Sequence, residues 1–193
     1  MKKQINKTSG LENIQMLAGL GNPGETYAHT YHNAGLLALT HLCDFPPHGW
    51  VCSGVHTPRN SFSYRTLTGP QKKTLLCIFP HTFMNESGRA IHDALLFFKL
   101  PVTSILVLHD DSDMTTGTYK ITFDQRSAGH KGIASIIQQC ASQEFYRCKI
   151  GIRPLEEIRR KKADEFVLKR ISKKDMDVFE KNIFSHIISD ILG

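Results

Sequence analysis

Two short, strongly apolar runs constrain the fold of this chain more than any other feature. Residues 14–20 (IQMLAGL) end in glycines, and residues 104–109 (SILVLH) are followed at once by Asp110, Asp111, Ser112 and Asp113. Apolar runs of this length that end in turn or polar residues are typical of buried strands. Further strands are predicted over 61–67, 74–79, 118–123 and 147–152.

Helical patterns alternate with these strands. Helices are predicted over 33–42, 86–98 and 132–141, whereas residues 44–60, rich in Pro, His and Ser, indicate a loop. A last helix should begin near Ser172, where Ser172 and Asp175 resemble a capping box. Its apolar stripe is Met176, Phe179, Ile183, Ile187 and Ile191. Strands alternating with helices predict an α/β fold, with helices on both faces of a sheet.

Length and composition favour one soluble domain. The chain has 193 residues, with 24 Lys+Arg against 18 Asp+Glu, and a net charge of +6 is a weak sign of a polyanionic partner. Five scattered cysteines argue against a disulfide framework and a zinc knuckle, and favour a reducing compartment. We find neither a secretory signal nor an apolar run of membrane-spanning length. The expectation is a cytoplasmic protein with a flexible extension over 1–13 and one domain over 14–193.

The glycine loop after the first strand resembles a dinucleotide fingerprint. Residues 19–24 (GLGNPG) match G-x-G-x-x-G, and Asp44 lies about twenty residues on. That fingerprint needs a helix to begin inside the loop, but residues 25–32 show no helical stripe, and a helix is predicted only near Asn33. We therefore interpret the loop as a tight strand-exit turn. A nucleotide-dependent enzyme is the third hypothesis, and it predicts binding of NAD or ATP.

Polar residues cluster where the predicted strands end. Asn22 follows the first strand, Asn85 follows residues 74–79, and Asp110 follows the strand at 104–109. Taken singly, each is an ordinary turn or capping residue, and His32 is one of ten histidines. Since sites in α/β sheets gather at the carboxyl ends of strands, the four residues can converge on one cleft.

Several motifs, taken in order, resemble the bacterial-type peptidyl-tRNA hydrolases over about residues 14–190. They are GLGNPG at 19–24, Tyr27, TYHNAG at 30–35, TFMNESG at 82–88, HDDSD at 109–113, GHKG at 129–132, Phe145, Arg147, Lys149, IGIRP at 150–154 and FVL at 166–168. The resemblance implies a single α/β domain with a twisted mixed sheet between helices. It also implies hydrolysis of the ester between a peptide and the 3′ ribose of tRNA, which recycles tRNA in translation.

The resemblance assigns roles to residues of this chain. His32 would be the general base, Asp110 its orienting carboxylate, and Asn22 and Asn85 would hold water, substrate or oxyanion. It also implies substrate or tRNA contacts by Tyr27, Asn33, Phe83, Asn85, His130, Lys131, Lys120 and Lys149. It implies no metal, no cofactor and no obligate protein partner, so a monomer acting on peptidyl-tRNA is expected.

The chain also departs from the family. Lys131 stands where Asn is usual, Tyr31 where Arg is usual, Thr122 where a second phosphate-binding cation is usual, and the loop 124–128 lacks the usual glycines. Residues 149–174 carry ten Lys or Arg against four acids, which fits either phosphate contact or a solvated face. These departures keep an alternative open: an inactive RNA-binding paralogue, as in the plant splicing factors that resemble this family.

Overall fold

A single mixed sheet forms the centre of the molecule. The computed structural model describes residues 10–154 and 166–192. Within them, eight strands follow the order β2-β4-β5-β1-β6-β8-β7, with β3 also paired to β4. The strands are β1 (Met16–Gly19), β2 (Val51–Cys52), β3 (His56–Arg59), β4 (Phe62–Thr68), β5 (Thr74–Pro80), β6 (Ile105–Thr115), β7 (Tyr119–Phe123) and β8 (Tyr146–Arg153).

The four central strands run in one direction. β1 pairs in parallel with β5 and β6, and β6 pairs in parallel with β8. The flanking strands β4 and β7 are antiparallel to their neighbours. The carboxyl ends of β5, β1, β6 and β8 therefore share one edge of the sheet, where ligands bind in open α/β folds.

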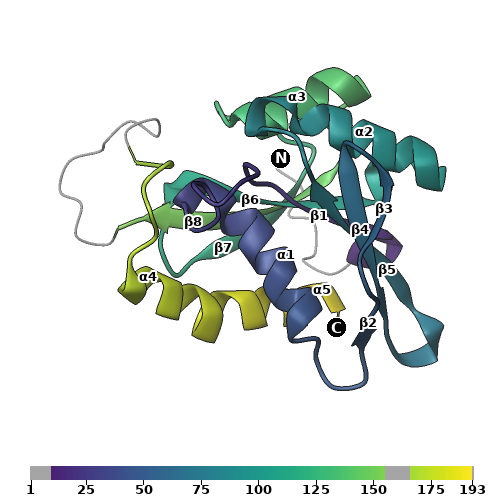
Figure 1. Cartoon of the computed structure of the whole chain (residues 1–193), viewed down its shortest axis with the longest axis horizontal. Coiled ribbons are helices and arrows are strands. Elements are labelled where there is room, and N and C mark those ends of the chain that lie inside the picture. The colour runs from purple at the N-terminus through teal and green to yellow at the C-terminus, as the bar shows by residue number, and fades with distance from the viewer. Residues whose placement is uncertain (1–9, 155–165, 193) are drawn as a thin grey trace, which may run out of the picture.

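Helices cover both faces of this sheet (Figure 1). One face packs against α2 (Ser87–Phe98) and α3 (Lys131–Cys140). The other packs against α1 (Ala34–Asp44) and a C-terminal helix built from α4 (Lys173–Val178), a π-helical turn (Phe179–Phe184) and α5 (Ser185–Leu192). Successive strand residues alternate between the two cores: Met16 and Ala18 face α2 and α3, and Leu17 faces α1. This confirms the predicted α/β sandwich.

A glycine lets α1 lie directly on β6. A Cβ at Gly35 would lie 2.1 Å from the carbonyl oxygen of Leu108, so no larger residue fits there. The close approach matters because α1 follows the 3-10 turn Tyr31–Asn33, which carries His32, and β6 carries Asp110. The packing of α1 on β6 thus sets how near these two side chains come.

Most predicted elements are confirmed, with two corrections. Residues 44–60 are not all loop, because Val51–Cys52 and His56–Arg59 pair with β4 as short edge strands. The strand predicted to stop at His109 continues to Thr115, because β8 pairs with it as far as Thr115↔Arg153 across a shift in register. The Arg153 guanidinium also donates to the Ser112 carbonyl, at 2.8 Å, within this polar part of β6.

The two ends of the chain add further detail. Ser172 caps α4 as predicted, since its Oγ accepts the Asp175 N–H at 3.0 Å. Of the extension predicted over 1–13, residues 1–9 lie outside the described residues. Leu11–Asn13 form a 3-10 turn, and the Leu11 side chain is buried in the core. Among the described residues, no helix combines the length and apolar character needed to cross a membrane.

Candidate active site

A cavity of about 700 Å³ opens where the parallel strands end. Asn22 follows β1, Asn85 follows β5, Asp110 lies on β6 and Lys149 on β8, and all four line the cavity. The cavity is also lined by His32, Phe83, His109, Asp111, His130, Lys131, Arg147, Val167 and Leu168. The structure therefore brings His32, Asp110, Asn22 and Asn85 together at one site, as expected from their positions at strand ends.

His32 and Asp110 form a buried dyad. His32 Nδ1 lies 2.8 Å from Asp110 Oδ1, and the Asp110 side chain is 3% exposed. Burial by itself raises the pKa of the Asp110 carboxyl, but the charge and hydrogen bond of His130, and then those of His32, hold that pKa well below its usual range. An ionised Asp110 accepts the Nδ1 hydrogen, so the Nε2 atom of His32 is left as the basic nitrogen.

A second histidine binds the same carboxylate oxygen. His130 Nε2 lies 2.9 Å from Asp110 Oδ1, and the His32 and His130 rings lie 5.1 Å apart. His130 is also the N-cap of α3, and its Nδ1 accepts the Ile133 N–H at 3.3 Å. Because Nδ1 accepts, the ring hydrogen sits on Nε2 and is donated to Asp110. Its predicted role was substrate contact; in the structure, its ring nitrogens hold Asp110 and cap α3.

His109 is a site residue that the sequence argument left without a role. Its Nδ1 donates to the Asp110 carbonyl oxygen at 2.7 Å, and its ring stands edge-on to His130 at 4.7 Å. Burial lowers the pKa of His109 well below its usual value, so the ring stays neutral. In the sequence, only its position next to Asp110 pointed to a place in the site.

Asn22 is held by hydrogen bonds on three sides. Its N–H donates to Asn33 Oδ1 at 2.8 Å, and Asn33 Nδ2 donates to the Asn22 carbonyl oxygen at 3.0 Å. Asn22 Oδ1 accepts the Met84 N–H at 2.7 Å, which ties the first strand-end loop to the segment that carries Phe83 and Asn85. Asn33 is fully buried and is not among the residues that line the cavity, and its carboxamide bonds the backbone of Asn22. Contact between Asn33 and substrate stays a prediction.

The remaining predicted binding residues divide into two groups. Exposed Phe83, Asn85 and Lys131 line the cavity together with half-buried Lys149, whose Nζ lies 2.9 Å from Asp111 Oδ2. Tyr27 and Lys120 are not among the lining residues. Tyr27 contacts the Phe83 ring edge-on at 6.2 Å. Lys120 is directly opposite Lys149 in the β7–β8 pair, so the two side chains share one face of the sheet.

Arg147 is a buried cation in the cavity wall. It is 1% exposed, its Nη1 donates to the Arg126 carbonyl oxygen at 2.8 Å, and its guanidinium stacks over the Phe145 ring at 4.6 Å. Burial lowers the pKa of Arg147 to about 10, so it stays charged at neutral pH. In the sequence Arg147 stands out only as part of a motif, because nothing in a sequence distinguishes a buried arginine from a solvated one.

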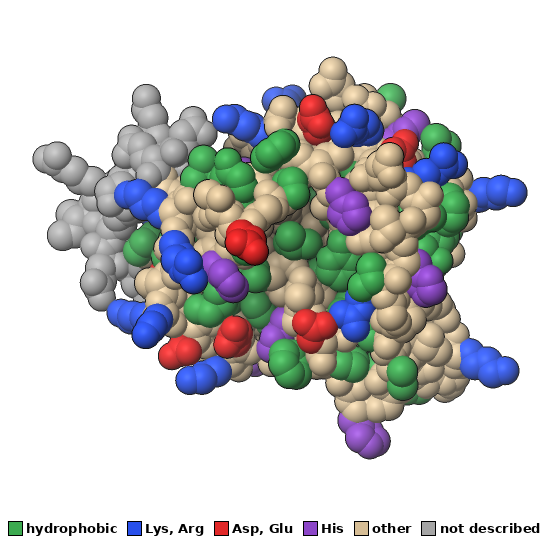
Figure 2. All heavy atoms as spheres, in the orientation of Figure 1, with side chains coloured by type: hydrophobic (Ala, Val, Ile, Leu, Met, Phe, Trp, Pro, Cys, Tyr) green, Lys and Arg blue, Asp and Glu red, His purple; other side chains and the backbone are tan. Residues whose placement is uncertain are grey.

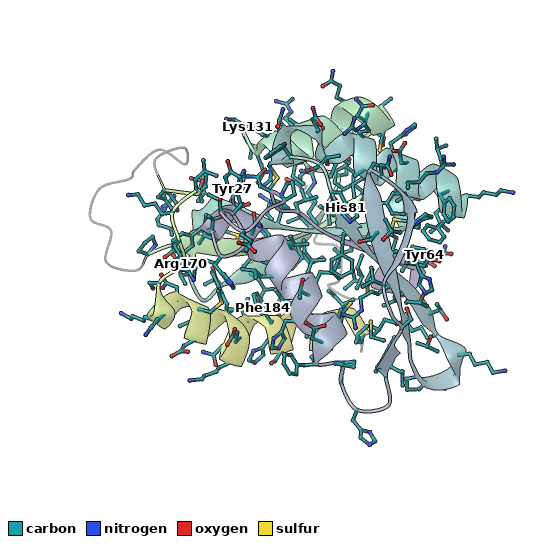
Figure 3. All side chains as sticks on the ribbon, viewed as in Figure 1. Tyr27, Tyr64, His81, Lys131, Arg170 and Phe184 are labelled. Carbon is teal, nitrogen blue, oxygen red and sulfur yellow. The ribbon has the colours of Figure 1, made fainter. Side chains whose placement is uncertain are left out.

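Basic side chains also surround the site. Figure 2 shows several Lys and Arg side chains gathered over α4 and the segment before it, and Figure 3 places Arg170 in that segment and Lys131 at the start of α3. Lys169, Arg170, Lys173 and Lys174 are all exposed there. Of the basic stretch noted at 149–174, residues 155–165 lie outside the described residues.

Among the described residues, one cluster of three side chains could hold an ion, and hydrogen bonding already accounts for its arrangement. The ligand atoms of His32, Asp110 and His130 all lie within 4.8 Å of one another. His130 Nδ1, however, is already an acceptor, and a neutral ring ligating a metal through Nε2 would need its hydrogen on Nδ1. The glycine loop fits no dinucleotide either, because turns follow Gly24 and the helix begins only at Ala34, as predicted.

Comparison with known proteins agrees with this geometry. The family model described as peptidyl-tRNA hydrolase matches residues 16–190. The peptidyl-tRNA hydrolase of Mycoplasma mycoides subsp. mycoides is 33% identical over 174 residues, 90% of this chain and 89% of that protein. That of Lactobacillus delbrueckii subsp. bulgaricus is 39% identical over 143 residues, 72% of each. The crystal structure of peptidyl-tRNA hydrolase from Acinetobacter baumannii matches with a TM-score of 0.78 at 26% identity, covering 93% of this chain and 87% of that one. This chain belongs to the peptidyl-tRNA hydrolase family.

Proposed function

We propose that this chain hydrolyses the ester that joins a peptide to the 3′ ribose of tRNA, with His32 as the general base. The observation that carries the proposal is the 2.8 Å bond between His32 Nδ1 and the ionised Asp110 carboxylate, at the wall of an open cavity. The products are a free peptide and a tRNA that can be charged again in translation.

The reaction needs one water and one proton shuttle. His32 Nε2 takes a proton from water as the water oxygen attacks the ester carbonyl, and Asp110 stabilises the imidazolium that forms. The tetrahedral intermediate then collapses, the ester C–O bond breaks, and the imidazolium returns the proton to the 3′ oxygen of the ribose. The Asn22 amide NH₂ can donate to the developing oxyanion, because its oxygen is already bound to Met84 N–H. Asn85, exposed beside it, can hold the substrate or the water.

The cations beside the cavity would bind tRNA phosphates. Lys131 and Lys149 line the cavity and Lys120 neighbours Lys149, so all three can meet the acceptor end of a tRNA whose ester lies near His32. Phe83, which is 52% exposed, offers an aromatic face to a terminal base. We expect the protein to act as a monomer in the cytoplasm, where peptidyl-tRNA is produced.

A labelling experiment tests this function directly. The protein is incubated with N-acetyl-aminoacyl-tRNA in ¹⁸O-enriched water, and the released acid and the tRNA are analysed by mass spectrometry. Hydrolysis at the carbonyl places the label in the carboxylate and none in the tRNA. Binding of the tRNA without any release of acid would instead support the alternative of an inactive RNA-binding paralogue, for which the intact set of His32, Asp110, Asn22 and Asn85 offers no support.

A further inference from the structure

The turn that carries His32 is held by the segment leading into the C-terminal helix. We name residues 167–171 the C-terminal strap. The His32 N–H donates to the Val167 carbonyl oxygen at 2.8 Å, and the Tyr31 N–H donates to the Lys169 carbonyl oxygen at 3.2 Å. The Ile171 N–H in turn donates to the His29 carbonyl oxygen at 2.8 Å. The backbone of His32 is thus supported by the C-terminal strap as well as by α1.

The Tyr31 side chain adds a second link to the same region. Its hydroxyl donates to Asp175 Oδ2 at 2.5 Å, a length typical of strong charge-assisted hydrogen bonds. The Tyr31 hydroxyl oxygen itself accepts the Ser172 N–H at 3.5 Å. Ser172 and Asp175 form the cap of α4, so the Tyr31 hydroxyl is inserted into the cap and joins it to the residue next to His32.

The surroundings of Tyr31 favour a stable hydrogen bond between its hydroxyl and Asp175. The residue is 7% exposed, and its ring meets the edge of Phe166 at 6.3 Å. Burial, and then the hydrogen bond to Asp175, raise the pKa of Tyr31, so the hydroxyl keeps its proton and remains a donor throughout the pH range of an assay.

We propose that Tyr31 is a positioning residue for hydrolysis, which fixes His32 against Asp110 by tying the 3-10 turn to the cap of α4. The inference rests on the proposed function, because it assumes that His32 is the base. The reason is geometric: general-base catalysis needs His32 Nε2 aimed at the attacking water, and about 1 Å of misplacement can reduce a rate by about 10²-fold. Backbone bonds to the C-terminal strap hold the turn, and the Tyr31 hydroxyl adds a side-chain bond to the cap of α4.

Tyr31→Phe tests the proposal by removing a single oxygen atom while keeping the ring. We expect kcat to fall by about 10-fold with KM changed by less than about 2-fold, because substrate contacts are untouched while the base is loosened. The acid limb of the pH–rate profile should move to lower pH, because a weaker contact with Asp110 stabilises the imidazolium less. Asp175→Asn should act in the same direction, and the double variant should be no slower than the slower single variant.

The chain contains a matched control. Tyr119 on β7 also donates to a carboxylate of the C-terminal helix, Asp190 Oδ2 at 2.8 Å, but Tyr119 is not next to His32. Tyr119→Phe therefore removes the same atom from the same kind of bond. We expect it to leave kcat and the pH profile unchanged.

The outcomes separate the inference from the proposed function. Thermal unfolding of each variant shows whether its fold is kept, and Asp175→Asn provides the test if Tyr31→Phe does not fold. The positioning role is overturned if the Tyr31 and Asp175 variants keep wild-type kcat and pH profile, or if they lose no more activity than Tyr119→Phe. If His32→Ala is as active as the wild type, His32 is not the base; if the wild-type protein releases no acid from N-acetyl-aminoacyl-tRNA, the proposed function itself fails.

Discussion

Asp110 is the residue on which the site depends, because one of its oxygens accepts hydrogen bonds from both His32 and His130. These partners lower the pKa of Asp110 against the effect of burial. A carboxyl whose pKa is lowered by folding stabilises the protein above its unfolded pKa of about 4, and that stability is lost as the pH falls through the folded value. Asp110 therefore remains ionised throughout the pH range of an assay.

Asp110→Asn tests this assignment. A carboxamide has no charge to stabilise the imidazolium, so we expect kcat to fall by about 10²-fold, less than on removal of the base itself. The acid limb of kcat/KM should also move to lower pH, because protonated His32 loses its counter-charge. A pH–rate profile identical to that of the wild type would show that Asp110 does not act on His32.

The sequence predicted which residues form the site better than it predicted which of them contact one another. Strand-end position and motif resemblance were enough to expect His32, Asp110, Asn22 and Asn85 in one cleft, and the structure brings them together. The contact of His130 with Asp110 and of Asn33 with Asn22 could not be derived, because these partners meet only after distant segments pack. The same holds for Tyr31 and Asp175, which are 144 residues apart.

Among the helices and strands, the incorrect predictions lie where strand pairing outweighs the local sequence pattern. Polar Asp111, Ser112 and Asp113 argue against a strand, yet β6 includes them because β8 pairs alongside and Arg153 donates to the Ser112 carbonyl. The edge strand β3 contains Pro58, a residue that sheets tolerate only at edges or bulges. Propensity and periodicity predict buried strands well and edge strands poorly. An edge strand is stabilised by hydrogen bonds to its neighbouring strand, and the local sequence does not show that neighbour.

The start of α3 carries one of the departures of this chain from the usual residues of its family. Lys131 is the first residue of α3, exposed and lining the cavity beside His130. It cannot accept the hydrogen bond from water that an Asn oxygen could, but its charge favours phosphate. Lys131→Asn should therefore raise kcat and weaken tRNA binding at low salt.

The comparison variant for this change is Lys99→Asn, at the other end of the neighbouring helix α2, where the backbone is left-handed and Asn is well tolerated. It removes the same charge far from the cavity. The role of Lys131 is tested by measuring the rate of hydrolysis by stopped flow and the equilibrium affinity for tRNA of both variants. If kcat and affinity are unchanged in Lys131→Asn, Lys131 has no part in the reaction.

At the scale of the whole molecule, charge should govern how tRNA is captured. The net charge is +6, and exposed cations gather over α4 and the segment before it (Figure 2). Phosphate contacts release counterions, so affinity should fall steeply as salt rises. The slope of log K against log salt concentration should be about −0.9 per phosphate contact on a duplex. Lys149→Ala should reduce that slope by about 1, whereas Lys73→Ala, near Trp50 and far from the cavity, should leave it unchanged. A salt-independent affinity would contradict phosphate-driven capture.

The most direct test of the whole account is the single-turnover rate of peptidyl-tRNA hydrolysis by His32→Ala. The matched control is His92→Ala, which removes a half-buried histidine on α2 that does not line the cavity. We predict that His32→Ala loses about 10²–10⁴-fold in rate while it still binds tRNA, and that His92→Ala keeps the wild-type rate. A His32→Ala rate within about twofold of the wild type would contradict the assignment of His32 as the base, because removing a general base lowers the rate by about 10²–10⁴-fold.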